Sequence, residues 1–494
     1  MTATALVTAL ETEAPASGAR ISGDGSVTIS GMTLDSRQVR AGDLYCCLRG
    51  ERADGHDFAA AAVDAGATAL LVDHLLDLEA TQLVVPDTRP AVGPLAATLW
   101  DHPSDRMAVV GITGTNGKTT TSYLLAAVLD HAGWSTGVMG TLTGSFTTPE
   151  APELQARLAE MAWEGRRAVA MEVSSHALAL HRVDGTRFAV AVFTNLGRDH
   201  LDLHGTIERY FAAKASLFTP GRAAVGIVNV DDVHGRQLAD AAPIAIVPFG
   251  LADAEDLAVG PTGSAFRWRG HDVTLPLGGR FNVANALAAA TAAAALGIAD
   301  DVIAAGLGLV APVPGRMEAV DAGQPFRIVV DFAHTPDALA GLLAELREVT
   351  PGRVIAVFGC GGDRDAEKRP LMGRSAAEGA DLVIVTSDNP RSEDPEAIVA
   401  AIVEGVPVPR RGNVIIEVDR RLAIGRALAE AVAGDVVVTE VDRRRAIARA
   451  LSKATAGDVV VIAGKGHETT QTVAGEKRLF DDRAVARELL EGAR

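Results

Sequence analysis

The chain has 494 residues, 48% of them hydrophobic, and a formal net charge of −17. This length predicts two to four domains, each with its own core. The acidic balance argues against a nucleic-acid or anionic-membrane binder, because phosphate contacts need a basic surface. The three cysteines match neither a disulfide framework nor a zinc site, and neither a signal peptide nor a membrane-spanning run is expected. We therefore expect a cytoplasmic protein.

Three α/β segments follow one another, separated by the stretches DHPSD at 101–105 and APVPGR at 311–316. In the first, strands are predicted at 26–30, 43–48 and 69–72 and a helix at 58–65. Strands at 107–110, 168–173, 188–194 and 225–230 alternate with helices in the second, and strands at 327–331, 354–358, 382–386 and 458–463 do so in the third. This alternation predicts parallel sheets with crossover helices.

The stretch GITGTNGKTT at 111–120 lies between a predicted strand and a helical pattern. A strand, a Gly-rich turn and a helix in this order direct backbone N–H groups at an anion. Gly114 and Gly117 allow close approach to phosphate, Lys118 can reach the β- and γ-phosphates, and the Thr119 hydroxyl can hold Mg²⁺. The pattern favours nucleotide binding over the alternative, an ordinary tight turn.

Polar motifs occur where the predicted strands end, which is where open α/β sheets bind ligands. They are Glu172, residues 195–200, Asp331, CGGDRD at 360–365, DNPR at 388–391 and GKGHE at 464–468. Scattered loop polarity explains one or two such coincidences but hardly six.

Lys214 lies on the apolar face of a predicted helix at 207–218. A lysine directed inward is costly unless it is paired or modified, so it is either an active-site group or a side chain whose ammonium reaches water. Glu172, Asp199, His200 and Asp202 on strand-end loops could provide Mg²⁺ ligands, although each acid could equally be a helix cap or a surface charge. The same loops carry His176, His181 and His204, which can equally be structural.

Ten motifs together resemble those of the Mur ligases of peptidoglycan precursor synthesis. They are GTNGKTT at 114–120, MEVSSHAL at 171–178, FTNLGRDHLDLHG at 193–205, FAAKASLF at 211–218, GRFNVANALAA at 279–289, PVPGRME at 312–318, VVDFAHTPDAL at 329–339, CGGDRDAEKRPLMG at 360–373, SDNPRSEDP at 387–395 and AGKGHE at 463–468. The last three narrow the resemblance to the members that add the third residue of the peptide. It runs from about residue 33 to 485.

The resemblance implies an α/β protein of three domains. These are a small N-terminal UDP-sugar-binding α/β domain at 1–103, a central P-loop ATPase domain with a mostly parallel sheet at 104–312, and a C-terminal Rossmann-like domain for the amino acid at 313–494. It also implies an ADP-forming ligase that joins UDP-MurNAc-L-Ala-D-Glu to meso-diaminopimelate through an acyl phosphate. ATP would be the cosubstrate and Mg²⁺ the cofactor, and we expect a monomer.

The resemblance also assigns residues to sites. The ATP site would comprise Gly114, Thr115, Asn116, Gly117, Lys118, Thr119, Thr120, Asn285, Arg316 and Asp331. The UDP-sugar and its dipeptide would contact Leu34, Ser36, Thr147, Thr148, Ser174 and Arg182, near the 51–53 loop. One Mg²⁺ would bind Thr119 and Glu172, and a second would bind His200 and Lys214, the latter as its CO₂ adduct. The catalytic candidates are Lys118, Glu172, His200 and Lys214. The incoming amino acid would meet Arg364, Asp388, Asn389, Pro390, Arg391, Gly464 and Glu468.

Two features complicate this assignment. Phe146 and Leu180 depart from the family pattern near the dipeptide, which puts polar contacts there in doubt.

Two alternative functions remain: another ligase of the same architecture, such as a sibling Mur ligase or folylpolyglutamate synthase, and a nucleotide-switched binding module. The DNPR and GKGHE motifs argue against the first, and Lys214 with Arg391 argues against the second.

A tandem repeat lies in the third segment. Residues 417–438 recur as 440–461, with 17 of 22 positions identical, and each copy holds one predicted helix and one strand. Only the second copy leads directly into Gly464, so we expect it to supply the strand of the sheet and the first copy to be a peripheral addition. The alternative is that the first copy supplies the helix.

Overall fold

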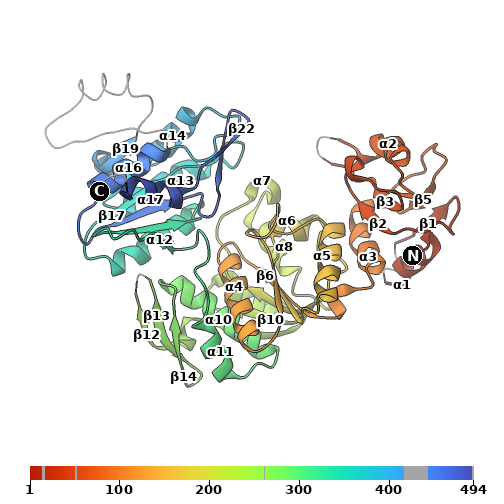
Figure 1. Cartoon of the computed structure of the whole chain (residues 1–494), viewed down its shortest axis with the longest axis horizontal. Coiled ribbons are helices and arrows are strands. Elements are labelled where there is room, and N and C mark those ends of the chain that lie inside the picture. The colour runs from red at the N-terminus through yellow and green to blue at the C-terminus, as the bar shows by residue number, and fades with distance from the viewer. Residues whose placement is uncertain (14–16, 51–52, 261, 417–442, 492–494) are drawn as a thin grey trace.

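The computed structural model describes the chain except for residues 14–16, 51–52, 261, 417–442 and 492–494. Three α/β units follow one another, with the N-terminal unit (red) and the C-terminal unit (blue) on opposite sides of the central one (Figure 1). The predicted α/β class with parallel sheets is confirmed. In the described part of the chain, no helix is both long and apolar enough to cross a membrane.

The N-terminal unit is a five-stranded sheet covered by helices on both faces. Its strands lie in the order β1-β5-β4-β3-β2, and all neighbours are parallel except β1 and β5. One hydrophobic cluster lies beneath α1 and α3, and another beneath α2. The elements are α1 (Ala3–Glu13), β1 (Arg20–Ser22), β2 (Gly31–Thr33), β3 (Asp43–Cys46), α2 (Ala59–Asp64), β4 (Ala69–Val72), β5 (Thr81–Val84) and α3 (Thr88–Leu99).

The central unit is built on a six-stranded, fully parallel sheet in the order β11-β10-β9-β6-β8-β7. Apolar residues fill both faces, and a three-stranded antiparallel sheet, β12-β13-β14, adds to one of them. The strands are β6 (Ala108–Thr113), β7 (Thr136–Met139), β8 (Ala168–Glu172), β9 (Phe188–Phe193), β10 (Ala223–Asn229), β11 (Ala245–Phe249), β12 (Glu255–Val259), β13 (Ser264–Trp268) and β14 (His271–Leu275). The helices are α4 (Lys118–His131), α5 (Ala151–Trp163), α6 (Ser175–Ala179), α7 (Leu201–His204), α8 (Ile207–Ala215), α9 (Val233–Ala241), α10 (Arg280–Ala295) and α11 (Asp300–Leu307).

The C-terminal unit has a six-stranded sheet in the order β15-β16-β20-β17-β18-β19, in which only β15 is antiparallel to its neighbour. Helices α12, α13 and α14 cover one face and α16 and α17 the other. The strands are β15 (Glu318–Ala319), β16 (Arg327–Asp331), β17 (Val354–Phe358), β18 (Leu382–Val385), β19 (Val414–Ile416), β20 (Val459–Ala463), β21 (Thr470–Val473) and β22 (Glu476–Leu479). The helices are α12 (Pro336–Val349), α13 (Lys368–Gly379), α14 (Pro395–Glu404), α16 (Arg443–Lys453) and α17 (Asp482–Glu491).

Most predicted strands are present, but two predictions need correction. The strand predicted at 26–30 is wrong, because the start of the chain bonds to this segment and leaves only an isolated bridge between Thr2 and Thr28. The helix predicted at 207–218 ends at Ala215, where the chain turns through a hydrogen bond from Leu217 N–H to the Lys214 carbonyl.

The second copy of the repeat supplies α16 and β20, and β20 is an inner strand between β16 and β17. A helix of the second copy thus packs on the sheet beside β20. The first copy, 417–438, lies outside the described residues.

Candidate active site

The Gly-rich turn joins β6, an inner strand of the central sheet, to α4. Gly114 has φ +149°, and a Cβ there would lie 1.9 Å from Thr194 Oγ1. Gly117, before the helix, has φ +86°, and a Cβ there would lie 2.3 Å from Asn285 Oδ1. Only glycine fits either position, because the backbone is left-handed and the space is already taken. The N-terminus of α4 therefore opens toward the carboxyl edge of the sheet, as an anion site requires.

The turn is held by its neighbours in the predicted site. Asn116 N–H donates to Asn195 Oδ1 at 2.9 Å, and Thr115 Oγ1 lies 3.0 Å from the Tyr210 hydroxyl. Thr120 is buried at the start of α4, and Asn285 Oδ1 accepts from Thr121 Oγ1 at 3.4 Å. The loops after β9 and the helix α8 thus brace the turn from one side and α10 from the other.

Lys118 folds back onto the turn itself. Its Nζ donates to the carbonyls of Gly114 (2.9 Å) and Thr115 (2.8 Å). Burial lowers the pKa of Lys118, and the charge of Glu172 opposes that effect. The ammonium is thus tethered within the turn, where phosphate oxygens could replace its two carbonyl partners.

Thr119 and Glu172 meet at the end of β8. Thr119 Oγ1 donates to Glu172 Oε1 at 3.0 Å, and it accepts from Arg316 Nη2 at 3.1 Å. Glu172 is almost fully buried and also accepts from the backbone N–H of Thr141 at 2.8 Å. Arg316 comes from the linker to the C-terminal unit, and its guanidinium lies 4.4 Å from the centre of the Phe332 ring.

Asp331, at the end of β16, borders the same region. Its carboxylate accepts from the N–H groups of Met317 and Ala333, both at 2.8 Å. Burial raises the pKa of Asp331, and the nearby charge of Arg316 opposes this rise. The two residues expected at the edge of the ATP site therefore lie close together on the C-terminal side of the turn.

Lys214 and His200 both lie near the Tyr210 ring. Lys214 is 1% exposed, its Nζ donates to the Gly114 carbonyl at 2.8 Å, and it lies 4.6 Å from the centre of the Tyr210 ring. Burial lowers the pKa of Lys214 far below its ordinary value, and the charge of Lys118 lowers it further. Burial also lowers the pKa of His200, to about 3, against the opposing charge of Asp199. Both side chains are thus favoured in their neutral forms.

These residues fit Mg²⁺ in part. The oxygens of Thr119 and Glu172 are buried, adjacent and of the type that Mg²⁺ prefers. Lys214 as an amine offers no oxygen, so it fits a hard cation only after carbamylation. The lowered pKa of Lys214 suits that reaction, because the neutral amine is the form that attacks CO₂.

The residues expected at the dipeptide also gather beside Glu172. Thr148 Oγ1 donates to the Glu172 carbonyl at 2.9 Å and accepts from Ser174 N–H at 3.0 Å. Arg182 Nη1 donates to the Thr148 carbonyl at 3.2 Å, and Thr147 Oγ1 lies 3.0 Å from Thr141 Oγ1. The residues expected at the dipeptide and those of the P-loop therefore meet on the two sides of Glu172.

Phe146, which departs from the family pattern, covers Arg182 with its ring centre 5.3 Å from the guanidinium carbon. Arg182 also pairs with Glu150 at 2.9 Å, and Glu150 pairs with Arg89 of α3 at 3.0 Å. This chain of ion pairs connects the N-terminal unit to the dipeptide residues. Leu34 and Ser36 follow β2, and Leu34 packs against the hydrophobic cluster that contains Ala151, the residue after Glu150. Residues 51–52 lie outside the described part of the chain.

The residues expected to receive the amino acid meet at the carboxyl ends of β17, β18 and β20. Asn389 Nδ2 donates to Glu468 Oε2 at 2.8 Å, and Asn389 Oδ1 accepts from Thr472 N–H at 2.9 Å. Arg391 Nη1 donates to the Gly362 carbonyl at 2.6 Å. Burial raises the pKa of Asp388, which lies beside this network. Pro390 adjoins the same loop, whereas Arg364 is exposed at the rim.

Three site residues escaped the sequence analysis. Thr141 donates to both oxygens of Glu172, and Lys465 Nζ donates to Glu468 Oε2 at 3.1 Å. The Tyr210 ring lies near both Lys214 and His200, 4.6 Å from Lys214 Nζ and 6.1 Å from the His200 ring. The sequence could have predicted two of them, because Tyr210 lies four residues before Lys214 on the same helix face and Lys465 lies inside the GKGHE motif.

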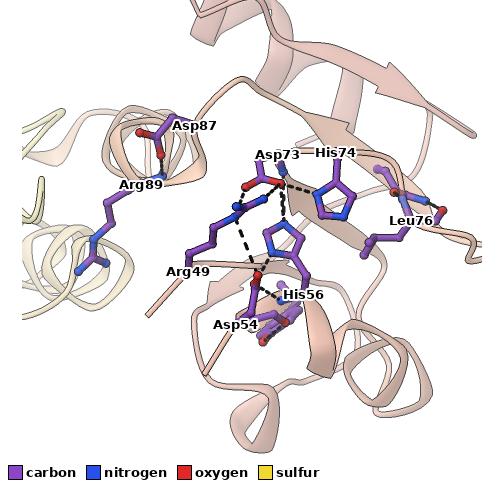
Figure 2. Close-up of polar contacts among 11 residues, drawn as sticks. Arg49, Asp54, His56, Asp73, His74, Leu76, Asp87 and Arg89 are labelled. Atoms are coloured by element: carbon purple, nitrogen blue, oxygen red, sulfur yellow. Dashed lines mark hydrogen bonds and ion pairs between the residues drawn. The ribbon is translucent and has the colours of Figure 1, made fainter. Parts of the chain in front are cut away.

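A separate cluster in the N-terminal unit has the composition of a metal site (Figure 2). His56, Asp73 and His74 bring three possible ligand atoms within 4.8 Å of one another, the one such group among the described residues. Arg49 Nε already lies 2.7 Å from Asp73 Oδ2, and His56 Nδ1 lies 2.6 Å from Asp54 Oδ1. Because the carboxylate already has a cationic partner, we interpret the cluster as an ion-pair network.

Comparison with known proteins identifies the family. Three family models match in chain order: "Mur ligase family, catalytic domain" at residues 28–98, "Mur ligase middle domain" at 112–293 and "Mur ligase, glutamate ligase domain" at 315–440. Proteins named UDP-N-acetylmuramoyl-L-alanyl-D-glutamate--2,6-diaminopimelate ligase are 47% identical in Streptomyces coelicolor (95% of this chain, 94% of that protein) and 46% identical in Streptomyces avermitilis (94% and 92%). A solved structure of that name has a TM-score of 0.65 at 32% identity and covers 100% of this chain and 99% of its own. The chain therefore belongs to the Mur ligase family.

Proposed function

We propose that the chain is an ATP-dependent ligase that joins the D-Glu carboxylate of UDP-MurNAc-L-Ala-D-Glu to meso-diaminopimelate. The observation that carries this proposal is the position of Glu172. Its side chain accepts from the P-loop residue Thr119, while its backbone carbonyl accepts from Thr148 of the proposed acceptor site. A phosphate donor and an acceptor carboxylate bound on these two sides would meet, as formation of an acyl phosphate requires.

The proposed reaction has two steps. A carboxylate oxygen of the acceptor attacks the γ-phosphorus of ATP, and the bond to ADP breaks. The neutral amine of the amino acid then attacks the acyl carbon, phosphate leaves with the electron pair of the broken C–O bond, and the amine loses a proton. Lys118 would exchange its two carbonyl partners for phosphate oxygens and neutralise charge on the transferred group.

Mg²⁺, when bound, would neutralise charge on the phosphate oxygens. In this proposal Thr119 and Glu172 hold one ion, and His200 with carbamylated Lys214 holds a second. Arg316 and Asp331 border the nucleotide and connect its site to the C-terminal unit. The acyl phosphate must be kept from water, and contacts between units support such closure: Arg198 of the central unit pairs with Glu367 at 2.8 Å, and its N–H donates to Asp337 at 3.0 Å.

The third substrate follows from the chemistry of the C-terminal loops. The Arg391 guanidinium suits a carboxylate, and Asp388 with Glu468 suits an ammonium. Meso-diaminopimelate carries a second amino-acid head with both groups, whereas L-lysine lacks the second carboxylate. The names of the two Streptomyces relatives include 2,6-diaminopimelate.

Three further points belong to the proposal. We place the domain boundaries at 103/104 and 312/313, where the described sheets and their hydrophobic cores change. We also propose a cytoplasmic location, since the three buried cysteines are free thiols, and a monomeric state.

The test is phosphate release from ATP across a panel of UDP-muramoyl acceptors and amino acids. We expect release only when UDP-MurNAc-L-Ala-D-Glu and meso-diaminopimelate are both present. Release with a different acceptor and amino acid would point to another ligase, and nucleotide binding without any acceptor-dependent release would favour a nucleotide-switched binding module.

A further inference from the structure

A fully buried ion pair lies beneath the proposed amino-acid site. Arg443, at the start of α16, and Asp482, at the start of α17, both have side chains that are 0% exposed. The guanidinium binds the carboxylate through two bonds, from Nε at 2.6 Å and from Nη2 at 2.7 Å. Removing two charges from water is costly, and apolar residues of similar size often stabilise a fold at least as much as a buried ion pair does. The pair therefore calls for a role other than holding the two helices together.

The same guanidinium also reaches the end of β20. Arg443 Nη2 donates to the carbonyl of Ala463 at 2.9 Å, and Ala463 is the last residue of that strand. Gly464 follows immediately with φ +111°, and a Cβ there would lie 2.8 Å from Asp388 Oδ2. This hydrogen bond therefore fixes the orientation of the peptide between Ala463 and Gly464, where the chain leaves the sheet and turns against Asp388.

The loop that begins at this turn carries the proposed ligand groups. Glu468 Oε2 accepts from Asn389 and from Lys465, so the loop after β20 is tied to the loop after β18. Two carboxylates, Asp388 and Glu468, are thus held near one another. Burial alone would lower the pKa of Arg443, but Asp482 above all, with Asp388 and Glu468, raises it. The charge of Arg443 is in turn the main influence that opposes the rise in the pKa of Asp388 caused by burial.

We propose that Arg443 is a positioning residue for the amino-acid substrate. Held by Asp482, its guanidinium fixes the peptide before Gly464 and balances the charge of Asp388 and Glu468, and it does so without contacting the substrate. This inference rests on the proposed function. It predicts that the ion pair determines affinity for the incoming amino acid more than affinity for ATP or the UDP-muramoyl acceptor.

The test compares KM values for the three substrates in two variants. The double variant Arg443→Met/Asp482→Leu replaces the pair with apolar side chains, and Arg443→Lys keeps the charge but loses the bidentate geometry. We expect KM for meso-diaminopimelate to rise roughly tenfold to a hundredfold in the double variant and less in Arg443→Lys. KM for ATP and for UDP-MurNAc-L-Ala-D-Glu should remain within about twofold of the wild-type values, because those sites lie on other loops.

The matched control is Arg444→Gln. Arg444 is the next residue of α16 and pairs with Glu488 of α17 at 2.6 Å, but this pair is exposed. Its loss should leave all three KM values and the melting temperature nearly unchanged.

A double variant whose KM for meso-diaminopimelate stays within twofold of wild type would overturn the inference, as would an equal rise in all three KM values. If the double variant does not fold, an unchanged amino-acid KM in Arg443→Lys decides against it. Failure of the proposed function is distinct, since wild-type protein would then release no phosphate in response to any amino acid.

Discussion

Replacing Lys214 by alanine tests whether this buried amine works as a carbamate. The amine forms a carbamate when its nitrogen attacks CO₂ and loses a proton, which requires the neutral form. Burial and the charge of Lys118 both lower the pKa of Lys214, so the site favours that form. The product would place two oxygens where the structure has an ammonium-like donor beside the Gly114 carbonyl.

The variant should lose activity while it keeps its fold. It loses one hydrogen bond, about 1 kcal/mol, and the packing of the neutral amine against the Tyr210 ring. Against this it removes a buried, poorly solvated amine, and lysine and alanine differ little in helix propensity. The net change should stay within about 2 kcal/mol of a total of roughly 5–15 kcal/mol. Loss of a charge-stabilising group beside the transferred phosphoryl should cost about 10²- to 10³-fold in kcat.

The pH dependence gives a second readout with a definite sign. Between the lowered pKa of folded Lys214 and its ordinary value, the unfolded chain holds a proton that the folded chain lacks. In CO₂-depleted buffer, wild type should therefore gain about 1.4 kcal/mol of stability relative to Lys214→Ala for each unit that the pH rises through this window. Denaturant unfolding at several pH values measures this difference.

The activity assay is phosphate release with all three substrates at saturation. Acetate or propionate should partly restore turnover in Lys214→Ala, because a carboxylate can take the place of the lost carbamate. Lys118→Ala is the control, since a missing ammonium cannot be replaced by a carboxylate. Near-normal rates in Lys214→Ala, or equal stimulation of both variants by acetate, would refute the reasoning.

Three further predictions concern other parts of the chain. L-Lysine offers no second carboxylate to the Arg391 guanidinium, so kcat/KM for meso-diaminopimelate should exceed that for L-lysine by more than roughly 10³-fold; comparable values would contradict this. Burial alone would raise the pKa of Asp458, but hydrogen bonds from Arg353 and from Thr455 outweigh it and lower the pKa. Asp458→Asn should therefore lower stability by on the order of 2 kcal/mol at pH 7, with the difference shrinking as the pH falls below about 4, and a calorimetric difference that is constant with pH would count against it. Deletion of 417–439, which removes one copy of the repeat in phase, should preserve soluble protein and ligation; loss of either would mean that both copies are required.

The strands of the parallel sheets could be predicted well because both of their faces are buried. Such strands appear in the sequence as short continuous apolar runs, and β17 coincides with one such run at 354–358. The P-loop was equally local, since its glycines, Lys118 and the helix that follows lie within a few residues. The segment at 26–30 has the alternating pattern of a half-buried strand, yet the first residues of the chain bond to it, and no local pattern reveals that competition.

The α/β class, the P-loop, the candidate site residues and the family that they resemble could all be inferred from the sequence, because each depends on residues that lie close together along the chain. How distant residues act on one another depends instead on the tertiary structure. Lys118 and Lys214 share the Gly114 carbonyl although Lys214 lies 100 residues from Gly114, and their mutual repulsion contributes to the lowered pKa of Lys214. The tertiary structure also places β20 between β16 and β17 and brings Arg443 close to the peptide before Gly464. The physical reason is that periodicity and turn chemistry specify elements, whereas strand order and the packing of helices across a sheet determine which side chains come within bonding distance.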